Sequence, residues 1–309
     1  MNIKIKQILN GLKWLWILLI ICFAVYYCYK NSYKINNALN LLPVLSITIS
    51  IAMIIAAKLF LGLTAYYSVR YTGKAVSFPK CFIMYNTTQM AKYIPGSIWQ
   101  FVSRAATYSN EGFSVRQIRN SIMIETGWVL SGAFVIGIVF ITFTNSMSLL
   151  EIYNKFSFII NIIILAFCFC AAASVLFFRK RLHDNLRKII SKKNLNLRMF
   201  FVEIVIWLLL GSSFSVLLYC SSVMTNEWLY VIGLYSLSYF IGFLVPFAPA
   251  GLGVREGILV LGLSHSVPQD TAITIAGINR IMYFSVEVVL AVISYCMIHY
   301  GKNRVESKI

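Results

Sequence analysis

Four ionisable residues lie within long apolar stretches of the sequence: Lys58, Glu125, Arg280 and Glu287. A charge near the centre of a bilayer costs about 2.5–3.5 kcal/mol on insertion scales, so each needs a partner, an aqueous path or a snorkelling route. For Lys58, Glu125 and Glu287 we expect roles in ion pairing or proton coupling. Purely structural ion pairs and snorkelling are the alternatives, and Glu125 suits either a shallow position or a buried partner.

Arg280 and Glu287 are separated by two helical turns, which predicts that they line the same side of one helix. Adding Lys92, Arg104 and Arg255 gives more basic than acidic groups in the apolar part of the chain. An anionic ligand would fit that surplus.

Two segments combine charged residues with residues that break helices. The first covers residues 78–104 and the second covers residues 243–263. Proline removes a backbone donor and glycine tolerates positive φ, so both suit a sharp reversal of the chain. In the first segment, Ser97 and Gln100 are three positions apart and predict a capping box at the start of a new helix.

Non-helical backbone at membrane depth is tolerated only where protein or a wet cavity satisfies its polar groups. Two broken segments, one in each half of the chain, are typical of transporters with paired discontinuous helices. Their helix amino termini would present free N–H groups to an anion. The alternative is a cytoplasmic amphipathic loop and an ordinary turn. The residues expected to contact the anion are Lys92, Pro95, Gly96, Ser97, Trp99, Gln100, Arg104, Gly251, Gly253, Arg255, Glu256 and Arg280.

Composition places these segments in a membrane protein. The chain is 59% hydrophobic and 12% charged over 309 residues, which is atypical of soluble globular domains. Its charge-free runs reach the roughly 20 residues that cross about 30 Å of hydrocarbon. Spans are predicted near residues 12–30, 42–69, 119–144, 156–178, 200–223, 228–246 and 271–299. We therefore expect one all-α domain, a polytopic helical membrane bundle of about seven to eight spans with two re-entrant or broken helices.

The net charge of +17 is explained better by membrane orientation than by nucleic acid, because the basic residues lie mainly in short loops between apolar runs. Bulky tyrosines follow the first apolar run, which favours a retained anchor over a cleaved signal. We expect a multi-pass protein of the cytoplasmic (inner) membrane with both termini in the cytoplasm. Residues 179–198 are predicted to form a basic cytoplasmic linker facing anionic lipid.

No catalytic, metal-binding or cofactor-binding constellation is expected. Cys168 and Cys170 have the wrong spacing for a zinc pair, and the three histidines are too scattered to indicate a site. The cysteines are most simply small apolar packing residues.

Two motifs carry a resemblance to a known family. They are Lys92-Tyr93-Ile94-Pro95-Gly96 followed by Trp99-Gln100, and Pro249-x-Gly251-Leu252-Gly253-Val254-Arg255-Glu256-Gly257. With them the chain resembles the lysylphosphatidylglycerol synthase transmembrane family, also called the flippase-like domain family, from about the second span onward. The resemblance implies re-entrant helices around a lipid-handling cavity. Members range from aminoacyl-lipid flippases to small proteins linked with polysaccharide or glycolipid assembly.

The sequence departs from the family pattern in two places. Ser103 stands where relatives often have Gly, and Ala250 stands where they often have Gly within Pro-Gly-Gly. We also expect no synthase activity, because the chain ends at Ile309 soon after the last span, without the cytosolic aminoacyl-transferase domain of the bifunctional relatives.

Three functions follow as hypotheses. A lipid translocase would admit an anionic phospholipid or lipid-linked glycan head group, neutralised by Arg104, Arg255 and Arg280, while the chains stay in the bilayer. A membrane-embedded transferase would need a carboxylate base or metal ligand at a wet face, which the sequence does not offer clearly. A noncatalytic subunit of a lipid or polysaccharide assembly complex is the third, and a homo-oligomer stays open.

Overall fold

The computed structural model describes residues 29, 42–94, 98–144, 193–220, 227–245, 248–264 and 266–306. Within these ranges all regular structure is helical, which confirms the predicted fold class of a helical membrane bundle. The helices are α3 (Val44–Tyr71), α4 (Phe78–Gln89), η1 (Met90–Tyr93), α5 (Trp99–Asn110), α6 (Val115–Phe143), α8 (Lys193–Cys220), α9 (Trp228–Leu244), η2 (Pro249–Gly251), α10 (Val254–Leu263) and α11 (Gln269–Glu306).

Among the described helices, α3, α6, α8 and α11 are long and apolar enough to cross a membrane. They correspond to the spans predicted near residues 42–69, 119–144, 200–223 and 271–299. The predicted spans 12–30 and 156–178 lie outside the described residues. α8 begins at Lys193, so residues 193–198 of the predicted basic linker are helical, and the rest of that linker lies outside the described residues. No proline or glycine separates Lys193 from the apolar part of α8, which explains why the helix extends into the basic stretch.

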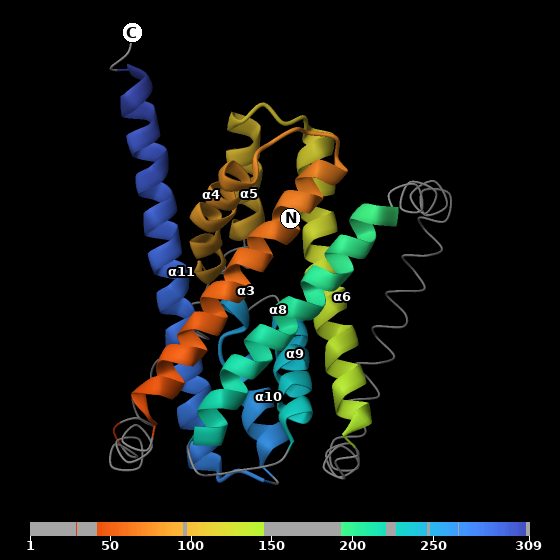
Figure 1. The fold of residues 1–309 in the computed structure, drawn as a ribbon, viewed down its shortest axis with the longest axis vertical. Helices are drawn as coiled ribbons and strands as arrows, with labels where there is room; N and C mark the ends of the chain where they lie inside the picture. Colours follow the sequence, from red (N-terminus) through yellow and green to blue (C-terminus); the bar gives the residue numbers. More distant parts are fainter. Residues whose placement is uncertain are drawn as a thin grey trace, which may run out of the picture.

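The predicted span 228–246 corresponds to α9, a shorter apolar helix of 17 residues, or about 25 Å, at the lower end of the length that crosses a membrane. It stops at the second broken segment, and α10 runs back from there toward the end of the bundle where α9 began (Figure 1). α9 and α10 are therefore the two arms of one re-entrant hairpin.

The first broken segment forms a second hairpin that enters from the opposite end. In Figure 1, α4 and α5 occupy the upper half of the bundle and α9 and α10 the lower half. η1 and η2, the breaks in the two hairpins, contact each other. Lys58, at the middle of α3, and Lys92 of η1 both bind Glu287 of α11. The breaks therefore meet near the mid-length of the spanning helices.

Small residues bring the helices close together. α8 packs on α3 and α9, and α6 packs on α9. At Gly211 of α8 an added Cβ would lie 2.8 Å from the Cα of Ile232 on α9, so only glycine fits. Close approach at small residues is the usual way in which membrane helices associate.

The second break contains the family departure at Ala250. Its φ of 50° is left-handed, a conformation that costs a non-glycine residue about 1–2 kcal/mol. Glycine, which relatives often have there, would adopt it without strain. The Ala250 carbonyl accepts a hydrogen bond from Arg280 Nη2 at 2.8 Å, which holds the turn in place.

Candidate functional site

Glu287 is the centre of a buried cluster that joins three elements. Its Oε1 accepts from Lys58 of α3 and Lys92 of η1, and its Oε2 accepts from the Tyr93 hydroxyl at 2.7 Å. Lys58 is 1% exposed and also donates to the Tyr283 hydroxyl at 2.7 Å. The cluster therefore fixes the first break against α3 and α11, and within it Lys58 and Glu287 form an ion pair.

Arg104 and Glu125 form a second buried ion pair, between α5 and α6. Arg104 Nε donates to the Thr88 hydroxyl at 3.1 Å, and its guanidinium lies over the Tyr85 ring, 4.5 Å from the ring centroid. Of the two alternatives for Glu125, the structure shows the buried partner. Because Glu125 balances its charge, Arg104 adds no net positive charge to the site in this conformation.

Arg255, in the first turn of α10, is 6% exposed and forms no ion pair with an acid of the described ranges. Its guanidinium lies over the ring of Tyr239, with 4.9 Å from the guanidinium carbon to the ring centroid, and more distantly over Tyr235 and Tyr283. It makes no hydrogen bond or ion pair with another residue of the described ranges, and its buried Nε lacks a partner there. Cation–π contacts stabilise the guanidinium but leave its charge and its N–H donors available to an anion.

Two glycines make room for this side chain. A Cβ at Gly242 would lie 2.5 Å from Arg255 Cγ, and one at Gly251 would lie 3.1 Å from it. Gly251 also has a φ of +70°, which favours glycine. Predicted site residue Gly251 therefore acts by shaping the space around Arg255.

Arg280 of α11 connects the two breaks. Its Nε lies 3.5 Å from Glu256 Oε1, and its guanidinium lies over the ring of Tyr93, the residue that binds Glu287. The prediction that Arg280 and Glu287 line the same side of one helix is thus confirmed. Glu256 Oε2 accepts from the Gly253 N–H at 2.7 Å, so this acid caps α10.

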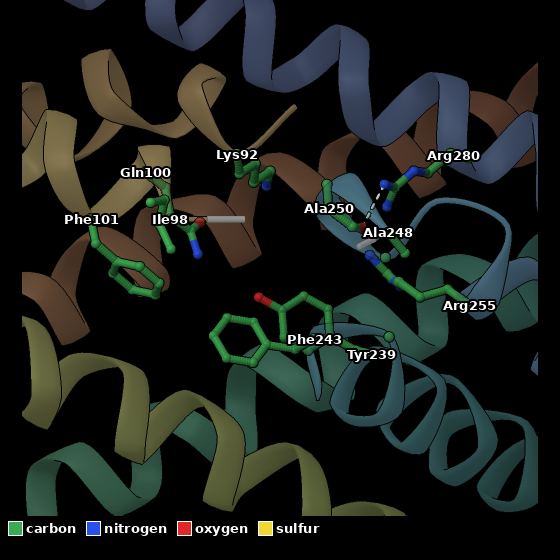
Figure 2. Close-up of a pocket in the computed structure, with 12 residues that line it drawn as sticks. Lys92, Ile98, Gln100, Phe101, Tyr239, Phe243, Ala248, Ala250, Arg255 and Arg280 are labelled. Carbon is green, nitrogen blue, oxygen red and sulfur yellow. Dashed lines mark hydrogen bonds between the residues drawn. The ribbon is translucent and has the colours of Figure 1, made fainter. Parts of the chain in front are cut away.

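A cavity of about 200 Å³ lies where the two hairpins meet. Figure 2 shows Arg255 and Arg280 reaching toward it from one side, Gln100 and Phe101 from the opposite side, and Lys92 and Tyr239 between them. A smaller cavity of about 50 Å³ shares Lys92, Gln100 and Tyr239 with it and extends to Arg104 and Glu125. Polar groups therefore line a path from Arg255 to the Arg104–Glu125 pair.

The structure unites part of the predicted site. Lys92, Gln100, Gly251, Arg255 and Arg280 line the larger cavity, and Arg104 lines the smaller one. Trp99, Gly253 and Glu256 line neither cavity. Pro95, Gly96 and Ser97 lie outside the described residues.

The predicted capping box at Ser97 and Gln100 is not tested, because Ser97 lies outside the described residues. α5 begins at Trp99 with Ile98 as its N-cap, without a side-chain capping bond. Gln100 is consequently in the first turn, and its side chain lines both cavities.

Sequence reasoning missed Tyr239 and Glu203. Tyr239 lies in an uninterrupted apolar run, and only packing shows that it lines both cavities. Glu203 is 2% exposed within α8. The span was predicted to begin near residue 200, which placed Glu203 close to its end. α8 begins at Lys193 instead, so Glu203 lies inside the helix.

No group of three or more histidines, cysteines or acids within the described ranges could hold a metal ion. The site in these ranges consists of cations, buried carboxylates, tyrosines and backbone. Such groups can bind and orient an anion and can exchange protons.

Comparison with known families identifies the chain. The family model described as lysylphosphatidylglycerol synthase TM region matches residues 7–291. The match covers most of the chain, which therefore belongs to this family, as the two motifs predicted. No curated protein matches the chain. The chain is thus a multi-pass membrane protein of a family related to lipids and glycans.

Proposed function

We propose that this member of the lysylphosphatidylglycerol synthase TM region family translocates an anionic lipid across the cytoplasmic membrane. The lipid would be a phospholipid or a lipid-linked glycan intermediate. The observation that carries the proposal is Arg255, a buried cation without an acidic partner among the described residues, at a cavity where two re-entrant hairpins meet. An unpaired charge inside a membrane protein is costly, and a ligand of opposite charge offsets that cost.

The size of the cavity favours a head group over a whole lipid. A volume of about 200 Å³ holds several water molecules, each of about 30 Å³ in the liquid, but no acyl chains. Ile98 lines the cavity and is 59% exposed, and the neighbouring Trp99 and Val102 are exposed as well. In this arrangement the phosphate enters the cavity while the apolar chains stay on the apolar outer surface, in contact with the bilayer.

The position of the cavity supports movement across the membrane. Each hairpin enters from a different end of the bundle, and the breaks meet near its middle (Figure 1). Rocking of one hairpin against the other would open the cavity to one end at a time, as in transporters built around discontinuous helices.

The distribution of basic residues supports an orientation. The end of α3, the α5–α6 junction, the start of α8 and the end of α11 lie toward the upper end of the bundle in Figure 1. Basic residues are frequent at these helix ends, and an excess of lysine and arginine marks the cytoplasmic side. We assign this end, which includes the end of α11, to the cytoplasm, and we propose the same side for both termini, as the sequence predicts. The basic residues concerned are Arg70, Lys74, Arg116, Arg119, Lys193 and Arg198.

Two other functions have weaker support. A transferase needs a free base near its substrate, and the acid among the described residues lining the two cavities, Glu125, is paired with Arg104. A noncatalytic assembly subunit would have no need of an uncompensated Arg255 at a central cavity.

The experiment is lipid transfer in reconstituted vesicles containing fluorescent phosphatidylglycerol or phosphatidylcholine. We expect protein-dependent transfer of the anionic lipid. Arg255→Ala should lower the transfer rate about ten- to a hundredfold, because it removes a hydrogen bond to a charged group, which contributes about 1.5–3 kcal/mol. Arg255→Lys keeps the charge but not the planar fork, so it should retain part of the rate. The control is Arg116→Ala, which removes an exposed arginine of α6.

Equal transfer in empty and protein-containing vesicles would refute the translocase. Formation of a modified lipid without transfer would favour the transferase. Full transfer by Arg255→Ala would refute the assigned site.

A further inference from the structure

Glu203 is a buried acid that the proposed anion site does not use. It lies in α8, about three turns from the helix start. Its Oε1 accepts a hydrogen bond from the Thr64 hydroxyl at 2.8 Å, while its Oε2 has no partner among the described residues. The buried indole Nε1 of Trp207 lies next to this carboxyl and directs its N–H donor toward it, but the two atoms do not meet hydrogen-bond geometry. Both unpartnered atoms face Gly132 of α6, where an added Cβ would lie 3.0 Å from the indole nitrogen and 3.2 Å from the carboxyl oxygen.

No cation of the neighbouring helices is available to this carboxyl. Away from their ends, α3, α6 and α11 carry two cations, Lys58 and Arg280, and these are paired with Glu287 and Glu256. The acids there, Glu125 and Glu287, are paired with Arg104 and with the two lysines, Lys58 and Lys92. Arg70, Arg116, Arg119 and Asp270 lie within two turns of the helix ends. From α9 the nearest titratable group is Tyr239, whose ring contacts Trp207. Burying an ionised carboxylate without a partner is far more costly than burying a neutral, hydrogen-bonded acid.

The groups around the Glu203 carboxyl are better suited to a carboxyl that binds a proton than to one that binds a metal cation. The polar groups that face the carboxyl are the Thr64 hydroxyl, which donates to it, and the Trp207 N–H, which can only donate. A hard cation takes about six oxygen ligands, and the described residues around Glu203 do not supply them.

A chain of contacts connects Glu203 with the cavity. The Trp207 ring packs edge-on against the Tyr239 ring, 4.9 Å between centroids. Tyr239 lines both cavities and carries the Arg255 guanidinium on its face. Two aromatic side chains, Trp207 and Tyr239, therefore lie between Glu203 and the Arg255 guanidinium.

We propose that Glu203 is a proton-binding residue of this protein and that its proton and the anionic head group bind together. The coupling rests on the proposed function, whereas the proton site rests on the geometry alone. The step is the reversible protonation of a carboxylate by a proton from water, and it requires no other reactant. A negative head group at Arg255 disfavours a second negative charge at Glu203, so the anion favours the protonated acid. By linkage, the protonated acid favours anion binding to the same extent.

The first test measures the affinity of the full-length protein, in detergent, for a short-chain phosphatidylglycerol as a function of pH. Wild type should bind this lipid about fivefold more weakly at high pH than at low pH, because the ionised Glu203 repels the negative head group. This is the order of magnitude for two unit charges in an interior with an effective dielectric constant of about 20. Glu203→Gln mimics the protonated acid, so it should bind tightly at every pH. The control Glu111→Gln removes an exposed acid, paired with Lys80, and should keep the wild-type profile.

The second test is independent of lipid. Infrared difference spectra between low and high pH should show the carbonyl band of a protonated carboxylic acid in wild type, and Glu203→Gln should lack it. Thr64→Val, which removes the one observed hydrogen bond, should shift the band without abolishing it.

The outcomes separate the two proposals. A missing Glu203 band at every pH, or an effect that requires sodium and disappears in choline buffer, would overturn the proton site. A titrating band with pH-independent affinity in wild type would overturn the coupling. A titrating band in a protein that binds no anionic lipid would refute the proposed function and leave the proton site established.

Discussion

Lys58 and Lys92 donate to the same oxygen atom, Oε1 of Glu287, although one lies in the middle of a spanning helix and the other in the break of a re-entrant hairpin. One carboxylate therefore compensates two ammonium groups at the centre of the bundle. Positive charge exceeds negative charge here even before Arg255 is counted. The arrangement ties the first hairpin to α3 and α11 and leaves the cavity electropositive.

Glu287→Gln should destabilise the protein strongly, because two buried ammonium groups would lose their counter-charge. Breaking a buried pair in this way costs about 3–5 kcal/mol. Thermal unfolding of the purified protein in detergent measures the effect. The control is Glu111→Gln, whose partner Lys80 is 53% exposed, and a surface pair contributes under about 1 kcal/mol. Similar losses for the two variants would show that the central cluster is not a structural ion pair.

Gly242→Ala should abolish function with little change in the spanning helices. The added Cβ would lie 2.5 Å from Arg255 Cγ, so the guanidinium must leave its place over Tyr239. We expect the transfer of labelled phosphatidylglycerol to fall at least about tenfold, as for removal of Arg255 itself. Gly127→Ala is the matched control, because its Cβ would meet no atom within 4 Å. An unchanged rate in a folded Gly242→Ala protein would contradict the assigned role of Arg255.

The membrane orientation can be tested with a cysteine-free variant that carries one new cysteine. Ser77→Cys, in the exposed loop between α3 and α4, should react with a membrane-impermeant maleimide only in inverted vesicles. Gln269→Cys, at the exposed start of α11, should react only in right-side-out vesicles. This pattern follows from the excess of basic residues at the end of the bundle that contains Ser77. The reverse pattern would invert the proposed orientation.

Sequence reasoning predicted Arg255 and Arg280 as site residues because charges in apolar runs and Pro/Gly breaks are local signals. The same reasoning did not show that α9 and α10 pack against each other as a hairpin, because hydropathy measures how apolar a segment is and not where the chain turns back. It also assigned Arg104 to the anion without deciding which acid holds it. Which acid balances which base depends on helices that are distant in the sequence, as Glu125 and Arg104 show.

The sequence by itself determined that this is a helical membrane protein with two broken segments and a surplus of basic residues, because hydropathy, proline and glycine act within a few turns of the chain. Only the tertiary structure decided that the two breaks meet at one cavity. It also decided that Lys58, Lys92 and Arg104 pair with acids, whereas among the residues that the structure describes Arg255 has no acid and Glu203 no cation as a partner. The physical reason is that the charge state of a buried site depends on which side chains packing brings within hydrogen-bonding distance, and that is a property of the folded bundle.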